Sequence, residues 1–341
     1  MLSIKRTIWV LAGSVFFVSA MVLSGLFYFY QDVIHSPVSP SPGPAVIFLI
    51  PKGASFSSVA ADLKKNGLLP HPYFFDLFAR RQNKRGSLKA GEYSLDSGMS
   101  PAQILDILTE GRSIQLSLTV PEGFNLREIA DRLEKMGAGS AEEFLKAARD
   151  REILERHGVP ASSFEGYLFP DTYNFSRGTR EADILIQMAG QFVKKARTED
   201  ISRGVAESGL TFHEVITLAS LIEKETGLEE EKSFIAAVFL NRLKKGMLLQ
   251  CDPTVIYGIE NFDGNIRKKD LKIDSPYNTY RYKGLPPGPI ANPGLGSIKA
   301  ALNPAPEKYI YFVSKKDGGH YFSSSLEEHN HAVAKYQLNK S

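Results

Sequence analysis

The sequence predicts an α+β protein with three parts: an N-terminal transmembrane helix, a small α+β module, and a larger, mixed but mainly helical domain with long loops. Three features of the chain support this prediction. A long uncharged apolar run opens the sequence, short β-prone runs alternate with amphipathic helical segments as far as Gly137, and helical periodicity dominates from Ser140. A chain of 341 residues has room for two or three compact domains.

The composition is that of an ordinary globular protein, with 43% hydrophobic and 23% charged residues. The net charge of +3 arises from 41 basic and 38 acidic residues that are well mixed along the chain. This balance gives no nucleic-acid-binding footprint, so no nucleic-acid partner is expected. The single cysteine, Cys251, excludes an intramolecular disulfide framework and a cysteine-rich metal site.

The N-terminal segment predicts a retained membrane anchor. Lys5 and Arg6 precede an uncharged run over residues 7–31, and roughly 20 apolar residues are enough to span a bilayer as a helix. Because the basic pair favours a cytoplasmic N-terminus, residues 1–6 are expected to form a cytoplasmic stub and the rest of the chain to be exported. A cleaved signal peptide is the alternative, since residues 18–20 loosely resemble a cleavage site, but the apolar run continues well past them.

Residues 32–44 are predicted to form a proline-rich linker. Proline recurs at short intervals between Ser36 and Pro44, which makes an extended, semi-rigid spacer of about 3 Å per residue. Such a spacer is expected to hold the following domains away from the membrane surface.

Three segments after the linker share a pattern of a short β-prone run, a turn with glycine, and an amphipathic helix that ends at glycine. The expected helices begin near Ser57, after the N-cap residue Ser100, and after the capping pair of Asn125 and Glu128. Strand–helix units of this size build small α+β modules. The sequence therefore predicts a module over residues 45–114 and a second domain over 115–341.

The second domain is expected to be mainly helical. Ser140 and Glu143 have the spacing of a capping box, and helical periodicity covers residues 182–197, 212–226 and 229–245. After Gly246 the sequence is rich in Pro, Gly, Asn and Tyr, which predicts long ordered loops rather than regular elements.

Glu225 is the main candidate for a catalytic group. It lies in the last turn of the predicted helix 212–226, which opens with a capping box of Thr211 and Glu214 and is expected to end at Gly227. A carboxylate at this end of a helix meets the partial negative charge of the helix dipole, which disfavours ionisation. A solvated glutamate at a helix end is the plain alternative.

The apolar neighbours of Glu225 distinguish it from the acid two residues earlier. On a helical wheel at about 100° per residue, Glu225 lies within about 60° of Leu218, Leu221 and Ile222, whereas Glu223 points roughly 160° away. Desolvation among leucines raises the pKa of a carboxyl group, which a general acid that works near neutral pH requires.

Other catalytic patterns are missing from the sequence. His213 and Glu214 begin like a zinc-protease helix, but Thr217 occupies the position of the second histidine. The chain has no serine-nucleophile elbow, no penicillin-binding serine pattern and no glycine-rich phosphate loop. Acid–base chemistry by carboxylates is what is left, and neither a metal nor an organic cofactor is predicted.

The sequence resembles the endolytic murein transglycosylases, a family of membrane-anchored bacterial enzymes that cut peptidoglycan strands. The resemblance is carried by ordered blocks that cover nearly everything after the linker: residues 165–173 (EGYLFPDTY), 219–226 (ASLIEKET), 239–243 (FLNRL), 250–258 (QCDPTVIYG), 275–280 (SPYNTY) and 284–294 (GLPPGPIANPG). Cys251 departs slightly from the pattern, because relatives often have another small residue there.

The resemblance implies that Glu225 is the catalytic acid, with Thr226 in the place of the serine that follows the glutamate in lysozyme-superfamily transglycosylases. It implies a LysM-like, glycan-contacting module, a lysozyme-superfamily-like catalytic domain, and a single-pass protein of the bacterial inner membrane. Peptidoglycan strands are then the expected substrate, and peptidoglycan synthases (penicillin-binding proteins) are candidate partners. The expected product has a 1,6-anhydromuramoyl end, formed without water as nucleophile.

The resemblance and the residue types also suggest which side chains line the substrate cleft, because amides, hydroxyls and aromatic faces suit sugar rings. The candidates are Gln250, Asp252, Thr254, Tyr257, Tyr277, Asn278 and Tyr280. A structural role is the alternative for each of them. Two other functions are also open: a hydrolase of the same bond, in which Asp252 or Glu165 steers water, and a glycan-binding scaffold without catalysis.

Overall fold

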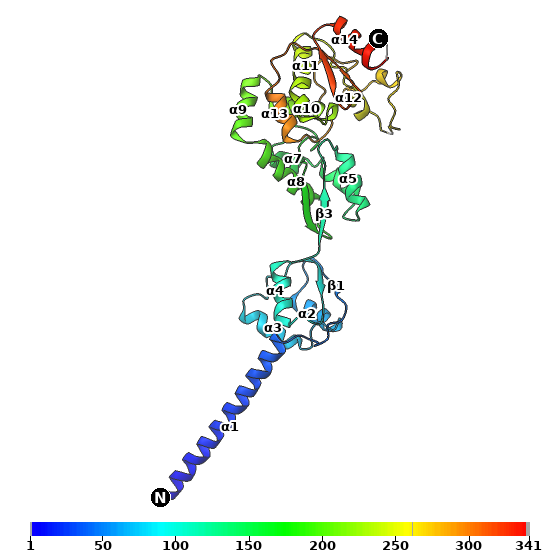
Figure 1. The fold of residues 1–341 in the computed structure, drawn as a ribbon. Helices are drawn as coiled ribbons and strands as arrows, with labels where there is room; N and C mark the ends of the chain where they lie inside the picture. Colours follow the sequence, from blue (N-terminus) through cyan, green and yellow to red (C-terminus); the bar gives the residue numbers. More distant parts are fainter. Residues whose placement is uncertain (1, 261, 339–341) are drawn as a thin grey trace. The chain divides into compact units, whose positions relative to one another are not determined.

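The computed structural model describes residues 2–260 and 262–338, and it divides into two compact units. Unit 1 comprises residues 1–116 with 176–178, and unit 2 comprises 117–175 with 179–341. Met1 in the predicted cytoplasmic stub, and residues 261 and 339–341 in the predicted second domain, lie outside the described residues. Helices predominate over short strands, which confirms the predicted mixed, mainly helical α+β class (Figure 1).

Unit 1 begins with the long apolar helix α1 (Leu2–His35). Within it, Gly13–His35 is long and apolar enough to cross a membrane, so the predicted N-terminal apolar helix is confirmed. The helix continues past its expected end at Gln31, because no proline follows until Pro37.

The last turn of α1 is partly buried, and the segment after α1 makes hydrogen bonds to the module. The side chain of Ile34 is fully buried. The backbone N–H groups of Val38 and Ser39 donate hydrogen bonds to the carbonyls of Met99 and Ser97, at 3.3 and 2.7 Å. The prolines lack N–H groups, but residues between them keep theirs and donate them to the module; the spacer role of residues 32–44 remains a prediction.

The module of unit 1 packs three helices against one two-stranded antiparallel sheet. The strands pair from Val46 opposite Leu95 to Ile50 opposite Gly91. In chain order the elements are β1 (Val46–Ile50), α2 (Phe56–Lys65), α3 (Pro72–Arg81), β2 (Gly91–Leu95) and α4 (Pro101–Glu110).

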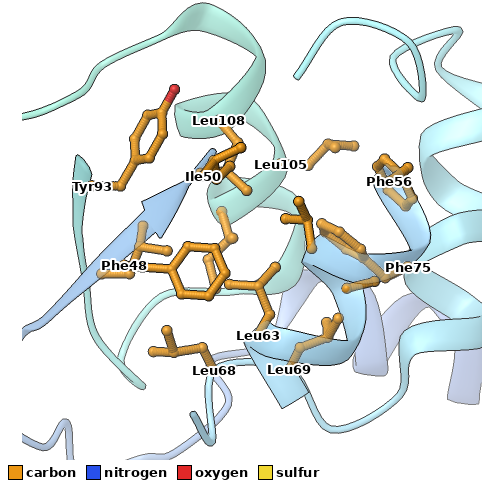
Figure 2. Packing of buried hydrophobic residues seen from close by; sticks show 14 of the residues in the cluster. Phe48, Ile50, Phe56, Leu63, Leu68, Leu69, Phe75, Tyr93, Leu105 and Leu108 are labelled. Carbon is orange, nitrogen blue, oxygen red and sulfur yellow. The ribbon is translucent and has the colours of Figure 1, made fainter. Parts of the chain in front are cut away.

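Figure 2 shows the apolar core of this module, to which every element contributes. Phe48 from β1, Leu63 from α2 and Leu105 from α4 are buried together. The rings of Phe56 and Phe75 stack with centroids 5.3 Å apart, which joins α2 to α3. Helix α3, which the sequence analysis did not predict, thus supplies part of the core.

Unit 2 is built around the buried helix α10 (Phe212–Glu225), which packs against α11, α12 and α13. Strand β3 pairs with β4, and β5 pairs antiparallel with β6 from Tyr311 opposite Ser323 to Ser314 opposite His320. The other elements are β3 (Gln115–Thr119), α5 (Leu126–Lys135), α6 (Ala141–Ala147), α7 (Arg151–Arg156), β4 (Thr172–Ser176), α8 (Glu181–Ala196), α9 (Glu199–Ser208), the 3₁₀ turns η1 (Glu229–Glu231) and η2 (Asp270–Lys272), α11 (Lys232–Lys244), α12 (Asp252–Tyr257), α13 (Leu295–Leu302), β5 (Tyr311–Ser314), β6 (His320–Ser323) and α14 (Leu326–Tyr336).

Two sequence-based predictions for unit 2 need correction. The capping box at Ser140 is only half formed, because the Ser140 N–H donates to the Glu181 carboxylate at 2.8 Å instead of to Glu143. The region after Gly246 is loop-like over residues 258–260 and 262–294, apart from η2, but it also contains α12, α13, α14 and the β5–β6 pair. Flanking prolines and glycines obscure these short elements in the sequence.

Candidate active site

Helix α10 places Glu225 at its C-terminal end. Thr211 and Glu214 form the predicted capping box at the start of the helix, and residues 215–222 are buried without interruption. The chain then leaves the helix in an extended conformation at Thr226, with φ −145° and ψ 139°. Thr226, rather than the predicted Gly227, is therefore the C-cap residue, and a β-branched side chain suits this extended backbone.

The two acids at the end of α10 have different surroundings, as the helical wheel predicts. The Glu223 carboxylate accepts hydrogen bonds from the Gly294 N–H at 2.9 Å and the Ser297 hydroxyl at 2.6 Å. It also lies 3.7 Å from the ammonium group of Lys232, which is 3% exposed. Glu223 thus holds α10 to the chain around α13, and its carboxylate is already committed to these partners.

Burial raises the pKa of the half-buried Glu225 to about 7. The Cys251 thiol, which donates a hydrogen bond to the Glu225 carboxylate, and the nearby cation Arg242 partly oppose this rise, whereas the negative charge of Asp252 adds to it. The predicted direction of the pKa change is confirmed. Glu225 can therefore hold a proton near neutral pH and release it without a large energetic cost.

The turn before α12 brings further side chains to Glu225, and we call Glu225, Cys251, Asp252 and Tyr280 the acid cluster. Tyr280 donates a hydrogen bond of 2.5 Å from its hydroxyl group to the carboxylate of the exposed Asp252. Gln250 precedes this cluster with a φ of 50°, a left-handed conformation that is uncommon for residues other than glycine. Its N–H donates to the Thr279 carbonyl at 3.1 Å, which holds the turn in place.

Arg242 supports this turn from inside unit 2. Its guanidinium group donates hydrogen bonds to the carbonyls of Ile310 at 2.7 Å and Leu249 at 2.8 Å, and it lies over the Tyr311 ring. Burial lowers the pKa of Arg242 from its ordinary value. The sequence does not indicate that Arg242 and Cys251 lie close to Glu225, because this proximity depends on the tertiary fold.

Thr226 and its neighbours fix the chain immediately after Glu225. The Thr226 hydroxyl accepts a hydrogen bond from the Leu228 N–H at 3.1 Å and donates one to Glu231 at 3.4 Å. Glu231 in turn accepts a hydrogen bond from the His320 N–H at 2.8 Å, and the His320 ring Nδ1 lies 2.7 Å from its carboxylate. These contacts join the end of α10 to strand β6.

Two of the predicted cleft residues, Thr254 and Asn278, are fully buried. The Thr254 hydroxyl donates to the Cys251 carbonyl at 2.6 Å, and the Asn278 amide donates to the Leu271 and Ile273 carbonyls at 3.0 and 2.8 Å. They therefore shape the loops from inside instead of lining a surface. Gln250 and Asp252 are exposed, and Tyr257, Tyr277 and Tyr280 are partly exposed.

Tyr257 and Tyr277 belong to a second group of side chains, which we call the Glu165 cluster. Their rings lie 4.8 Å apart, and the Tyr257 hydroxyl donates to the Glu165 carboxylate at 3.2 Å. The first N–H of α5, that of Leu126, points to both Glu165 oxygens at 3.2 Å. Burial raises the pKa of Glu165 to about 7.

A cavity of about 690 Å³ adjoins the Glu165 cluster. Glu165 and Tyr257 line it, together with Lys224 from α10 and Pro253 from α12. Lys224 and Pro253 are the chain neighbours of Glu225 and Asp252, but none of the four residues of the acid cluster is among those that line this cavity. The Glu165 carboxylate accepts hydrogen bonds from Leu126 and Tyr257, and its alternative role, in which it steers water in a hydrolase, remains a prediction.

Asn292 and Gly166 allow close contact between segments of unit 2 that lie far apart in the sequence, around residues 124, 166–168 and 289–292. The fully buried Asn292 amide accepts from the Leu168 N–H and donates to the Phe124 carbonyl, both at 2.9 Å. Gly166 has a φ of 83°, and a Cβ atom there would overlap the Pro289 ring. Only glycine therefore allows the chain next to Glu165 to approach the proline-rich loop so closely.

Glu165→Gln is expected to stabilise the protein at pH 8 and to have little effect at pH 4. The folded-state pKa of about 7 lies above the ordinary value of 4.5, so the folded state binds the proton more tightly than the unfolded state. The contribution of protonated Glu165 to wild-type stability is thus fully present below pH 4.5. It is lost as the pH rises through 7, by up to about 3 kcal/mol in total. Glutamine keeps an acceptor for Leu126 and Tyr257 but cannot ionise.

Thermal unfolding of the full chain in detergent at both pH values tests this expectation. Glu260→Gln, which removes an exposed acid from the same cavity, is the matched control for loss of a charge. An equal effect of Glu165→Gln at pH 4 and pH 8 would contradict the assigned protonation state.

Among the residues that the structure describes, no group of three or more His, Cys, Asp or Glu side chains is arranged to hold a metal ion. A family model described as the YceG-like family matches residues 48–335 of the chain. The chain is 34% identical over 339 residues to an endolytic murein transglycosylase of Bacillus subtilis (strain 168), and the match covers 94% of this chain and 92% of that protein.

A second relative is an endolytic murein transglycosylase of Streptococcus pneumoniae serotype 2 (strain D39), with 30% identity over 355 residues. That match covers 94% of this chain and 64% of the relative. Among solved structures, a yceG-like protein from Listeria monocytogenes is similar, with 34% sequence identity and a TM-score of 0.58. The match covers 84% of this chain and 98% of the Listeria chain.

Proposed function

Because the chain belongs to the YceG-like family, we propose that it is an endolytic murein transglycosylase, a lyase that cuts the glycan strands of peptidoglycan. The observation that carries this proposal is the position of Glu225 at the end of α10, with a pKa of about 7. A carboxyl group that is protonated near neutral pH supplies the acid that cleavage of a glycosidic bond needs.

Glu225 acts first as acid and then as base. Its proton passes to the β-1,4 oxygen between N-acetylmuramic acid and N-acetylglucosamine as the bond from that oxygen to C1 breaks. The carboxylate then takes the proton of the muramoyl C6 hydroxyl, whose oxygen bonds to C1. The product is a 1,6-anhydromuramoyl end, and one carboxyl group that changes role is sufficient, unlike the two carboxylates of ordinary glycosidases.

Exposed and partly exposed side chains of both clusters bind the sugar rings. Gln250, Asp252 and Tyr280 offer groups beside Glu225, and the Tyr257 and Tyr277 rings of the Glu165 cluster offer faces for stacking. Arg242, Thr254 and Asn278 hold this surface from behind. The catalytic part resembles a lysozyme-type domain, and the module of unit 1 is a LysM-like region that contacts glycan.

Helix α1 anchors the enzyme in the bacterial inner membrane as a single span, with the N-terminus in the cytoplasm. The module and unit 2 then lie on the extracytoplasmic side, where peptidoglycan synthases (penicillin-binding proteins) extrude new strands. Cutting such strands close to the membrane terminates their elongation.

A hydrolase of the same bond is the second candidate function. The observation that favours it is Asp252, an exposed carboxylate close enough to Glu225 to raise its pKa, which offers a base for water. In that case the new strand end is a reducing sugar instead of an anhydro sugar.

The chemical nature of the new strand end tests the proposal. Purified full-length enzyme is incubated with nascent peptidoglycan strands, and the products are separated and weighed by mass spectrometry. The expected product lacks one water relative to the hydrolytic product, because its terminal muramoyl residue carries the 1,6-anhydro ring. Reducing ends would establish the hydrolase. If no strand preparation is cleaved, the remaining function is that of a non-catalytic, glycan-binding scaffold.

A further inference from the structure

The first turns of α3 lie beside the last turns of α1. The Phe74 ring contacts the rings of Phe29 and Tyr30, with centroids 5.9 Å away in both cases, and the Phe78 ring contacts His35 at 5.7 Å. Later residues of α1 contact later residues of α3, so the two helices run in the same direction here. Together with the buried Ile34, these contacts fix the junction between the helix and the module.

The position of Phe29 and Tyr30 in α1 sets the level of α3 relative to a bilayer. They lie near the end of the uncharged run over residues 7–31, and roughly 20 residues of helix already cross the hydrocarbon core. Aromatic residues at such an end prefer the interface between lipid tails and headgroups. Phe74, which contacts both of them, lies at the same level, and so does its neighbour Tyr73.

Helix α3 exposes an apolar face at this level that no part of the described chain covers. The Tyr73 side chain is 77% exposed and the Leu77 side chain is 37% exposed. The two residues are four apart and therefore lie on one face of the helix. Tyrosine combines an apolar ring with a polar hydroxyl group, which suits the headgroup region of a membrane.

The charges on α3 are also compatible with lipid headgroups. Arg80 and Arg81 are exposed in the last turn of α3, and the Arg81 guanidinium group lies over the Tyr30 ring, at the level assigned to Tyr73. The only acid of the helix, Asp76, is paired with Arg80 and Arg85 at 2.7 Å each, so the helix presents no unpaired negative charge to phosphate groups.

We propose that helix α3 docks the module directly on the outer membrane–water interface, with Tyr73 and Leu77 inserted among the lipid headgroups beside α1. The occupant of this face is the bilayer itself, because the face continues the surface of the membrane helix. The inference depends on the proposed anchoring by α1 but not on the enzymatic activity. It makes the module a second membrane contact in addition to the anchor.

Tryptophan fluorescence tests the docking in the full chain, because Trp9 in α1 is the only tryptophan. Trp9→Phe is combined with Tyr73→Trp, and the protein is reconstituted in vesicles with lipids brominated near the headgroup or near the chain ends. Leu49→Trp in the same background is the matched control, since Leu49 is an exposed apolar residue on β1, which pairs with β2 and not with α1.

The Tyr73→Trp protein is expected to be quenched by headgroup-proximal bromine about twofold more strongly than the Leu49→Trp protein. Leu77→Trp provides a second reporter with the same expectation. Equal quenching at positions 73 and 49 would overturn the docking. Failure of the anchor is recognised separately, because wild-type Trp9 would then escape quenching by either brominated lipid.

Discussion

Glu225→Gln is expected to lower the rate of strand cleavage by about 10²–10⁴-fold without unfolding the protein. Glutamine has nearly the shape of glutamic acid but cannot give a proton to the glycosidic oxygen or take one from the C6 hydroxyl. Because burial raises the pKa of Glu225 to about 7, the substitution also removes a carboxylate that is costly to ionise. The variant is therefore expected to be at least as stable as the wild type at pH 8.

The rate is measured as release of soluble fragments from nascent peptidoglycan, and the stability by thermal unfolding of the same preparation. Glu223→Gln is the matched control, since it changes the acid two residues earlier and keeps hydrogen-bond acceptors for Gly294 and Ser297. The control is expected to retain cleavage within several-fold. If the Glu225→Gln protein cleaves strands at the wild-type rate, Glu225 is not the catalytic acid, regardless of the result for Glu223→Gln.

Lys232→Met is expected to destabilise the protein by about 3–5 kcal/mol. The buried ammonium group of Lys232 lies 2.9 Å from Glu229, 3.7 Å from Glu223 and 3.8 Å from Glu122. Methionine fills a similar volume without the charge, so the buried Glu223 carboxylate loses its nearest cation. Denaturant unfolding of the full chain in detergent measures the loss.

The double variant Lys232→Met with Glu223→Gln separates loss of charge compensation from loss of packing. Removing the uncompensated carboxylate is expected to recover most of the stability, because glutamine still accepts from Gly294 and Ser297. If the double variant is no more stable than Lys232→Met alone, the electrostatic explanation fails and a packing defect is responsible.

The sequence predicted the parts of the fold that depend on local signals. The N-cap residue Ser100 and the capping pairs at Asn125 and Thr211 marked three helix starts that the structure contains. Helix α3 also has start and stop signals, with Pro72 at its first position and basic residues in its last turn. Its apolar periodicity does not indicate a helix, because its aromatic residues contact both α1 and the module core and so do not form one apolar stripe.

The direction of the pKa change at Glu225 was predictable because its main cause is burial, which the apolar neighbours on the same helix face indicate. The roles of Cys251 and Arg242 were not, because these residues meet Glu225 only after α10, α11 and the turn before α12 have packed. Thr254 and Asn278 show the opposite difficulty. Their residue types suggest sugar binding, but in the structure both side chains donate hydrogen bonds to backbone carbonyls inside unit 2.

Asn292 has a consequence for the way unit 2 acquires its structure. This one amide links chain segments at residues 124, 168 and 292, so the link can form only after the last of them has been synthesised. Contacts so distant in sequence close slowly. Until then this link between the segments on either side of Glu165 is missing, and a chain whose synthesis is not complete is therefore expected to be inactive.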